Sequence, residues 1–168
     1  MRRKPGQHLS QDGIDLARLV GAGSGPFSLV VTSPVPRAVE TAIAMGFEVD
    51  ETDDFLGLIP TGSGYGWPAP FARVSDAARE GGAAATFARQ MARAWQDIVE
   101  RIPESTQALI VTHGGIPEMG AVAAVSDEPH EDWGDAIGYC EGVRLTFDDR
   151  FTGCEVLRVP EEYRLIEN

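Results

Sequence analysis

The sequence contains few cysteines and no long apolar run. Its two cysteines, Cys140 and Cys154, lie far apart, with no Cys-x-x-Cys motif and no histidine close by. This spacing favours reduced, partly buried thiols over a zinc site or a disulfide. No apolar stretch approaches the length of a membrane span, and the basic N-terminus lacks the apolar segment of a signal peptide. We therefore expect a cytoplasmic protein.

Positive charge is also scarce. Lys and Arg total 14 against 26 Asp and Glu, which gives a formal net charge of −12. Such a balance disfavours binding to nucleic acid or to an anionic membrane, so neither is an expected partner. A site for an anion must therefore gather its few cations locally. Arg2, Arg3, Lys4 and Arg37 are the candidates, although the first three also fit a frayed, solvated terminus.

The length of 168 residues and the 43% apolar content predict one domain with a single core, without internal repeats. The segment 55–70 is rich in Gly and Pro, which excludes a helix or a central strand there. Its Gly62–Gly66 stretch matches neither Gly-x-Gly-x-x-Gly nor Gly-x-Ser-x-Gly, which argues against dinucleotide binding and a serine nucleophile. A long irregular segment of this kind is either a substrate loop or a flexible surface loop.

Elsewhere, strand and helix patterns alternate. Helices are predicted over 11–20 with Ser10 as N-cap, from Pro36 to about Gly46, over 84–102 and over 117–125. Strands are predicted over 27–32 and 108–112, with a short strand at 47–49 before a solvated acidic loop at 50–54, and an antiparallel edge hairpin of 143–147 and 155–159 joined by 148–153.

Polar side chains follow the two buried strands. His113 ends the 108–112 strand and precedes two glycines and a helix, which is where open α/β sheets bind ligands. Arg37 lies in the first turn of the helix that follows the 27–32 strand, and its guanidinium suits a phosphate. Ser33 offers a hydroxyl donor there, or caps the following helix. Taken alone, His113 also fits a loop cap and Arg37 a surface arginine.

Together these segments resemble the histidine phosphatase superfamily, the phosphoglycerate-mutase-like group. The resemblance rests on Ser-Pro-x-x-Arg-Ala-x-x-Thr-Ala starting at Ser33, Thr-His-Gly-Gly starting at Thr112, and Leu-Ser-x-x-Gly starting at Leu9. It spans nearly the whole chain. It implies an α/β fold, a single-domain three-layer sandwich whose mostly parallel sheet has helices on both faces and an antiparallel edge hairpin. It also implies that segment 55–70 borders the active site.

The resemblance implies phosphoryl transfer through a phosphohistidine, on a small phosphorylated substrate or inorganic phosphate, with no metal or other cofactor. Arg37, His113 and Ser33 would bind the phosphoryl oxygens and stabilise their charge. Glu118, just after His113, is a candidate general acid, but acids also favour the first turn of any helix.

One family feature is missing. Members begin with a strand ending in Arg-His-Gly, whose histidine is the nucleophile, and this motif occurs nowhere in the sequence. His8 precedes the first helix, and His130 lies in a polar segment that we expect to be solvated. We expect that the start given as Met1 is internal and that the strand lies upstream. The alternatives are a non-catalytic phospho-ligand binder and a plain interaction domain on the same fold.

Overall fold

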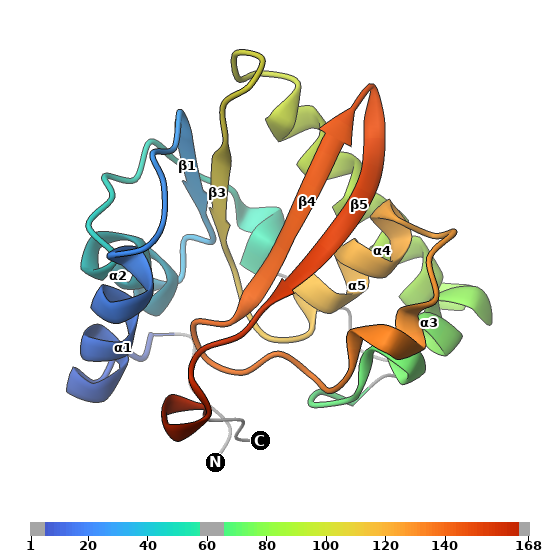
Figure 1. Ribbon diagram of the computed structural model, residues 1–168, viewed down its shortest axis with the longest axis horizontal. Helices are drawn as coiled ribbons and strands as arrows, with labels where there is room; N and C mark the ends of the chain where they lie inside the picture. The colour runs from blue at the N-terminus through green and yellow to red at the C-terminus, as the bar shows by residue number, and fades with distance from the viewer. Residues whose placement is uncertain (1–5, 58–65, 165–168) are drawn as a thin grey trace. The chain divides into compact units, whose positions relative to one another are not determined.

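The computed structural model describes residues 6–57 and 66–164, which form two compact units (Figure 1). The basic residues 2–4 and the 58–65 part of the predicted loop lie outside the described residues. The first unit comprises Met1–Leu58 and Ile98–His113, and the second comprises Ile59–Asp97 and Gly114–Asn168. The expected α/β class is confirmed.

The first unit is a parallel sheet with two helices. Its elements are α1 (Gln11–Gly21), β1 (Leu29–Thr32), α2 (Pro36–Ala44), β2 (Glu51–Thr52), the 3-10 turn η1 (Asp54–Gly57) and β3 (Ala108–Val111). The strand order is β2-β1-β3, and Thr32 of β1 pairs with Val111 of β3. The C-terminal ends of β1 and β3 therefore lie next to each other, which places the residues after both strands at one edge.

Helix α2 packs on β1 and β3, and α1 packs on α2 (Figure 1). Ser10 caps α1 as predicted, accepting a hydrogen bond from the Gly13 N–H at 3.2 Å. The apolar core under α2 shares buried side chains from three elements, namely Val30, Ala38, Ala42 and Val111. This core fixes α2 against the strands and so fixes the helix turn that carries Arg37.

The prediction of a strand at 47–49 is wrong, whereas the acidic stretch after it is mostly exposed, as expected. Phe47 instead packs edge-on against Phe27, with ring centroids 4.8 Å apart, and Val49 lies against the same core. The strand is β2, inside the predicted acidic loop, where Glu51 pairs with Val31. Both side chains of β2 are exposed, because this edge strand contributes its backbone rather than an apolar face.

The second unit combines three helices of the described chain with a hairpin. Its elements are α3 (Phe71–Arg79), almost all of α4 (Gly82–Val99), α5 (Ile116–Ala124), η2 (His130–Trp133), β4 (Gly142–Asp148), β5 (Arg150–Leu157) and η3 (Glu161–Tyr163). Helix α5 packs against α3 and β4. The fully buried side chains include Phe71, Met91, Ile116 and Met119.

Three elements in this part of the chain differ from the predictions. Helix α3 was not anticipated, and α4 ends at Val99, before the predicted Ile102. The predicted loop 148–153 is mostly strand, since β4 and β5 meet at a tight turn where Asp149 has φ of 58°. A register shift after Thr146 leaves one extra residue, Thr152, on β5. Among the described residues, the hairpin forms its own two-stranded sheet.

Candidate active site

Three predicted site residues of the first unit lie together at the C-terminal edge of the parallel sheet. The Nη2 atom of Arg37 is 3.3 Å from Nδ1 of His113, and Nε2 of His113 is 2.9 Å from Oγ of Ser33. Ser33 follows β1 and is fully buried, whereas Arg37 and His113 are partly buried. Ser33 and His113 lie together because β1 and β3 end side by side. The Ser33 N–H continues the pairing of these strands by donating to the Val111 carbonyl at 2.9 Å.

These contacts fix the tautomer of His113. A guanidinium only donates hydrogen bonds, so Nδ1 of His113 must accept from Arg37. Nε2 then carries the ring proton and donates it to Ser33. Burial, together with the charge of Arg37, lowers the pKa of His113 to about 4. His113 is therefore a neutral imidazole at neutral pH, with both nitrogens engaged.

Ser33 has one further contact, which bears on its predicted alternative role. Its Oγ accepts a second hydrogen bond from the Val35 N–H at 3.3 Å. Val35 is itself the N-cap residue of α2, and no side chain caps that helix. Ser33 therefore bonds the cap residue and not the first helical turn. Since its oxygen accepts twice, its hydroxyl proton is left to donate elsewhere.

Two neighbouring segments hold the edge in place. Thr112 donates to the Leu56 carbonyl at 2.5 Å, which ties η1 to the end of β3. Gly57 lies so close to Ser33 that an added Cβ would be 3.0 Å from the Ser33 hydroxyl oxygen. On α2, one turn beyond Arg37, Glu40 accepts from His8 at 2.5 Å and from the Leu9 N–H at 2.7 Å. These bonds, from His8 first, hold the pKa of Glu40 below its usual value.

Glu118, the candidate general acid, lies on α5 in the second unit. It is fully buried, and its carboxylate accepts from the Trp67 indole at 3.0 Å, the Gly115 N–H at 2.8 Å and the Ile137 N–H at 3.3 Å. Burial raises the pKa of Glu118, although the hydrogen bonds from Gly115, Trp67 and Ile137 oppose this. The three contacts all use the carboxyl group as an acceptor.

The expectation that His130 is solvated is wrong. His130 is only 2% exposed, and its ring nitrogens bond Ser75 Oγ and the Val125 carbonyl, both at 2.8 Å. Its ring also meets Trp133 edge-on at 4.6 Å. The acidic neighbours of His130 in the sequence suggested an exposed segment, but η2 turns the His130 side chain inward.

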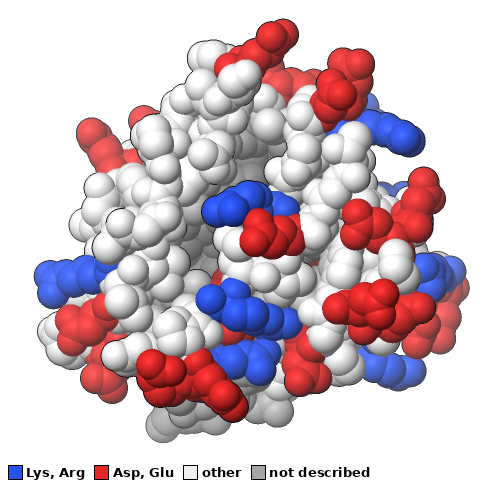
Figure 2. All heavy atoms as spheres, in the orientation of Figure 1, with Lys and Arg blue, Asp and Glu red and all other residues white. Residues whose placement is uncertain are grey.

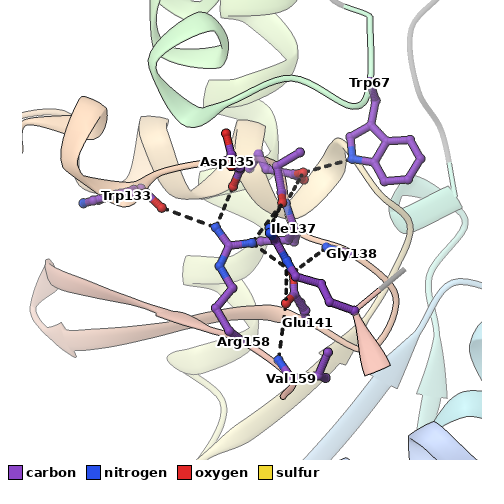
Figure 3. Close-up of polar contacts among 11 residues, drawn as sticks. Trp67, Trp133, Asp135, Ile137, Gly138, Glu141, Arg158 and Val159 are labelled. Atoms are coloured by element: carbon purple, nitrogen blue, oxygen red, sulfur yellow. Dashed lines mark hydrogen bonds and ion pairs between the residues drawn. The ribbon is translucent and has the colours of Figure 1, made fainter. Parts of the chain in front are cut away.

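Sequence reasoning missed a second group of polar contacts, centred on the Glu141 side chain (Figure 3). Its carboxylate, fully shielded from solvent, accepts from Arg158 at 2.9 Å and from Arg164 at 3.1 Å. Burial raises the pKa of Glu141, but the Gly138 N–H and the two guanidiniums outweigh it, so the pKa is lowered. This cluster ties the residues after β5 to the segment before β4. No spacing in the sequence pairs these residues.

The thiols, possible metal ligands and surface charges of the described chain complete this description. Cys140 and Cys154 are free, and burial raises their pKa values to about 11 and about 12. Within residues 6–57 and 66–164, no cluster of three or more metal-ligating side chains is found, and no helix is long and apolar enough to cross a membrane. Figure 2 shows acidic side chains spread over the visible face, with basic ones in small groups among them.

Comparison with solved structures identifies the fold. A phosphoserine phosphatase from Entamoeba histolytica, solved with 3-phosphoglyceric acid, matches with a TM-score of 0.71 at 15% identity, over 97% of this chain and 90% of that one. A mycobacterial glucosyl-3-phosphoglycerate phosphatase, solved with VO3, matches with a TM-score of 0.65 at 21% identity, over 95% and 90%. A mycobacterial hydrolase matches with a TM-score of 0.60 at 20% identity, over 92% and 88%.

The chain therefore has the histidine phosphatase fold that its motifs predicted. At these identities the likeness establishes the fold. Neither protein-family models nor curated protein sequences show a match to this chain.

Proposed function

We propose that this chain binds the phosphoryl group of a small phosphorylated molecule and serves phosphoester hydrolysis or phosphoryl transfer of the histidine phosphatase type. The observation that carries the proposal is the Arg37–His113–Ser33 arrangement at the strand ends of a parallel sheet. It places a guanidinium donor and a hydroxyl donor at the two ring nitrogens of one imidazole, with Arg37 at 3.3 Å and Ser33 at 2.9 Å from His113. Such donors stabilise the charge on phosphoryl oxygens.

The nucleophile in this proposal is not one of the three histidines of the sequence. His130 is buried in the second unit, and His8 is an exposed side chain bonded to Glu40. His113 uses both ring nitrogens in its contacts with Arg37 and Ser33. We propose that the nucleophilic histidine is supplied by a strand preceding the present sequence, which pairs with β3. In support, β3 is the terminal strand of its sheet within the described residues.

Binding of inorganic phosphate, measured calorimetrically at pH 7, tests the anion site. Arg37→Ala should weaken binding by about 1.5–3 kcal/mol, the range for a hydrogen bond to a charged group, which is roughly 10- to 150-fold in Kd. Arg18→Ala is the matched control, since Arg18 is an exposed arginine of the same unit, 3.5 Å from Asp15. Equal phosphate affinity of wild type and Arg37→Ala would refute the site.

Turnover separates the enzyme from the alternative, a non-catalytic phospho-ligand binder, which the missing Arg-His-Gly motif favours. We expect the 168-residue chain to hydrolyse a generic aryl phosphate no faster than background. An extended protein carrying an upstream, in-frame Arg-His-Gly strand should hydrolyse it and unfold at a higher temperature. An in-frame stop codon close to Met1 would favour the binder. Turnover by the short chain that disappears in His113→Ala would instead make His113 the nucleophile.

A further inference from the structure

Of the three side chains at the anion site, His113 is the one whose charge can change near neutral pH. In the free chain its Nδ1 accepts a hydrogen bond from the Arg37 guanidinium at 3.3 Å, and its Nε2–H donates to the Ser33 hydroxyl at 2.9 Å. The ring is therefore neutral, with both nitrogens engaged. All three residues belong to the first unit, so their mutual geometry is set within that unit.

The Ser33 side of the imidazole needs no change when an anion binds. Ser33 Oγ accepts from Nε2–H of His113 and from the Val35 N–H at 3.3 Å, so its own hydroxyl proton remains to donate. An anion oxygen that accepts this proton leaves both existing hydrogen bonds in place. Any rearrangement on anion binding therefore falls on the other ring nitrogen, Nδ1.

On the Arg37 side, the lone pair of Nδ1 and an incoming anion compete for the same donor. The guanidinium is the natural partner of a phosphate-like anion, because it offers charge and N–H groups together. Once Arg37 donates to the anion, Nδ1 is a partly buried acceptor that has lost its donor, which is costly. The negative charge beside it also stabilises an imidazolium. A proton on Nδ1 removes the cost and gives the anion a second charged donor.

The charges around the ring are consistent with this exchange. Burial, and after it the charge of Arg37, keeps the pKa of His113 low in the free chain. An anion that neutralises Arg37 removes the second of these two causes. The carboxylates on α2, at η1 and in the first turn of α5 are exposed or bonded to other groups, namely Glu40, Asp53, Asp54 and Glu118.

We propose that the site takes up a proton with the anion that it binds: Arg37 moves its hydrogen bond from Nδ1 of His113 to the anion, and Nδ1 takes a proton from solvent. This inference rests on the proposed function, since it concerns the same anion site. The imidazolium then adds a positive charge beside the guanidinium. A chain with a formal net charge of −12 thereby gains a cation at the site only while an anion is bound.

The test reads the proton directly and counts it. Ring-nitrogen NMR of His113 shows whether Nδ1 carries a proton, without anion and with saturating sulfate or inorganic phosphate. The Kd for sulfate is then measured against pH, because sulfate keeps its charge over this range whereas phosphate titrates. His113→Gln removes the titrating ring. His8→Gln is the matched control, since His8 is an exposed imidazole of the same unit, bonded to Glu40.

We expect either anion to place a proton on Nδ1 in wild type and in His8→Gln. The Kd for sulfate should fall by up to about tenfold for each pH unit between about pH 7 and pH 5, the slope for one proton per anion, and His113→Gln should lack this slope. A bound anion beside an unprotonated Nδ1, or an equal slope in His113→Gln, would overturn proton uptake and leave the anion site standing. A wild-type chain that binds neither anion would overturn both proposals, and phosphate binding unaffected by Arg37→Ala would refute the proposed function.

Discussion

Replacing Arg37 by methionine should raise the pKa of His113 from about 4 toward its ordinary value. The guanidinium lies 3.3 Å from Nδ1, and burial and this charge together lower the pKa of His113 to about 4. Two unit charges about 4 Å apart interact by roughly 1 kcal/mol in water and roughly 4 kcal/mol near a protein surface, equivalent to about 0.7 to 3 pH units. Burial is the larger cause, so Arg37 accounts for less than half of the fall from about 6.5. The effect of the Arg37 charge on the pKa of His113 therefore lies in the lower part of this Coulomb range.

Methionine keeps the apolar stem and removes the charge, so burial of His113 changes little. The measurement is an NMR titration of the His113 Cε1–H resonance between about pH 3 and pH 8. Arg18→Met is the control, because Arg18 pairs with Asp15 on an exposed helix surface. Arg37→Lys keeps a charge and should keep the pKa low. A titration in Arg37→Met that coincides with wild type would refute the contact and the tautomer inferred from it.

Three further outcomes follow from other contacts. The pKa of His113 is lower in the folded than in the unfolded chain, so the stability it contributes is present above about pH 6.5 and is lost as the pH falls toward 4. His113→Gln should therefore flatten the pH dependence of the free energy of unfolding, measured in urea, between these two pH values. An unchanged slope would contradict this prediction. Glu141→Gln should lower the free energy of unfolding, measured in urea, by about 1.5–3 kcal/mol, because it removes the charge that pairs with Arg158 and Arg164. An unchanged free energy would mean that these ion pairs do not stabilise the fold. Gly21→Ala should lower it by about 1–3 kcal/mol, because the new Cβ would lie 2.1 Å from the Met45 carbonyl oxygen; wild-type stability would contradict this close approach.

The sequence predicts those parts of the fold whose side chains carry the signal. Strands β1 and β3 are apolar runs, and α4 repeats its buried residues Phe87, Met91 and Trp95 at helical spacing. Strand β2 has no such signal, because an edge strand of two exposed residues pairs through backbone atoms alone. The 47–49 stretch resembled a strand for the opposite reason, since its apolar side chains pack on the core without pairing.

The site divides in a similar way. Ser33 and His113 follow their strands closely, so parallel pairing of β1 with β3 brings them together, and the packing of α2 on these strands adds Arg37. Trp67 reaches Glu118 across 51 positions of sequence, and its segment is dominated by glycine and proline. A large aromatic side chain in such a segment, which also contains Phe55 and Tyr65, is a weak sequence signal. Burial of His130 and Glu141 arises from tertiary turns that no local pattern records.

The hydrogen bonds of the site run in one direction, from the Arg37 guanidinium through His113 to the Ser33 hydroxyl. A glutamine at position 113 has the same polarity, with a carbonyl oxygen to accept from Arg37 and an amide N–H to donate onward, but it has no proton to gain. A glutamate at position 113 would interrupt this chain of hydrogen bonds, since an ionised carboxylate has no proton to donate to Ser33. His113→Gln thus separates the two properties of this imidazole, its hydrogen-bond direction and its ability to titrate. If an anion binds the glutamine variant as tightly as wild type, its binding depends on the hydrogen-bond direction at position 113 and not on titration of the imidazole.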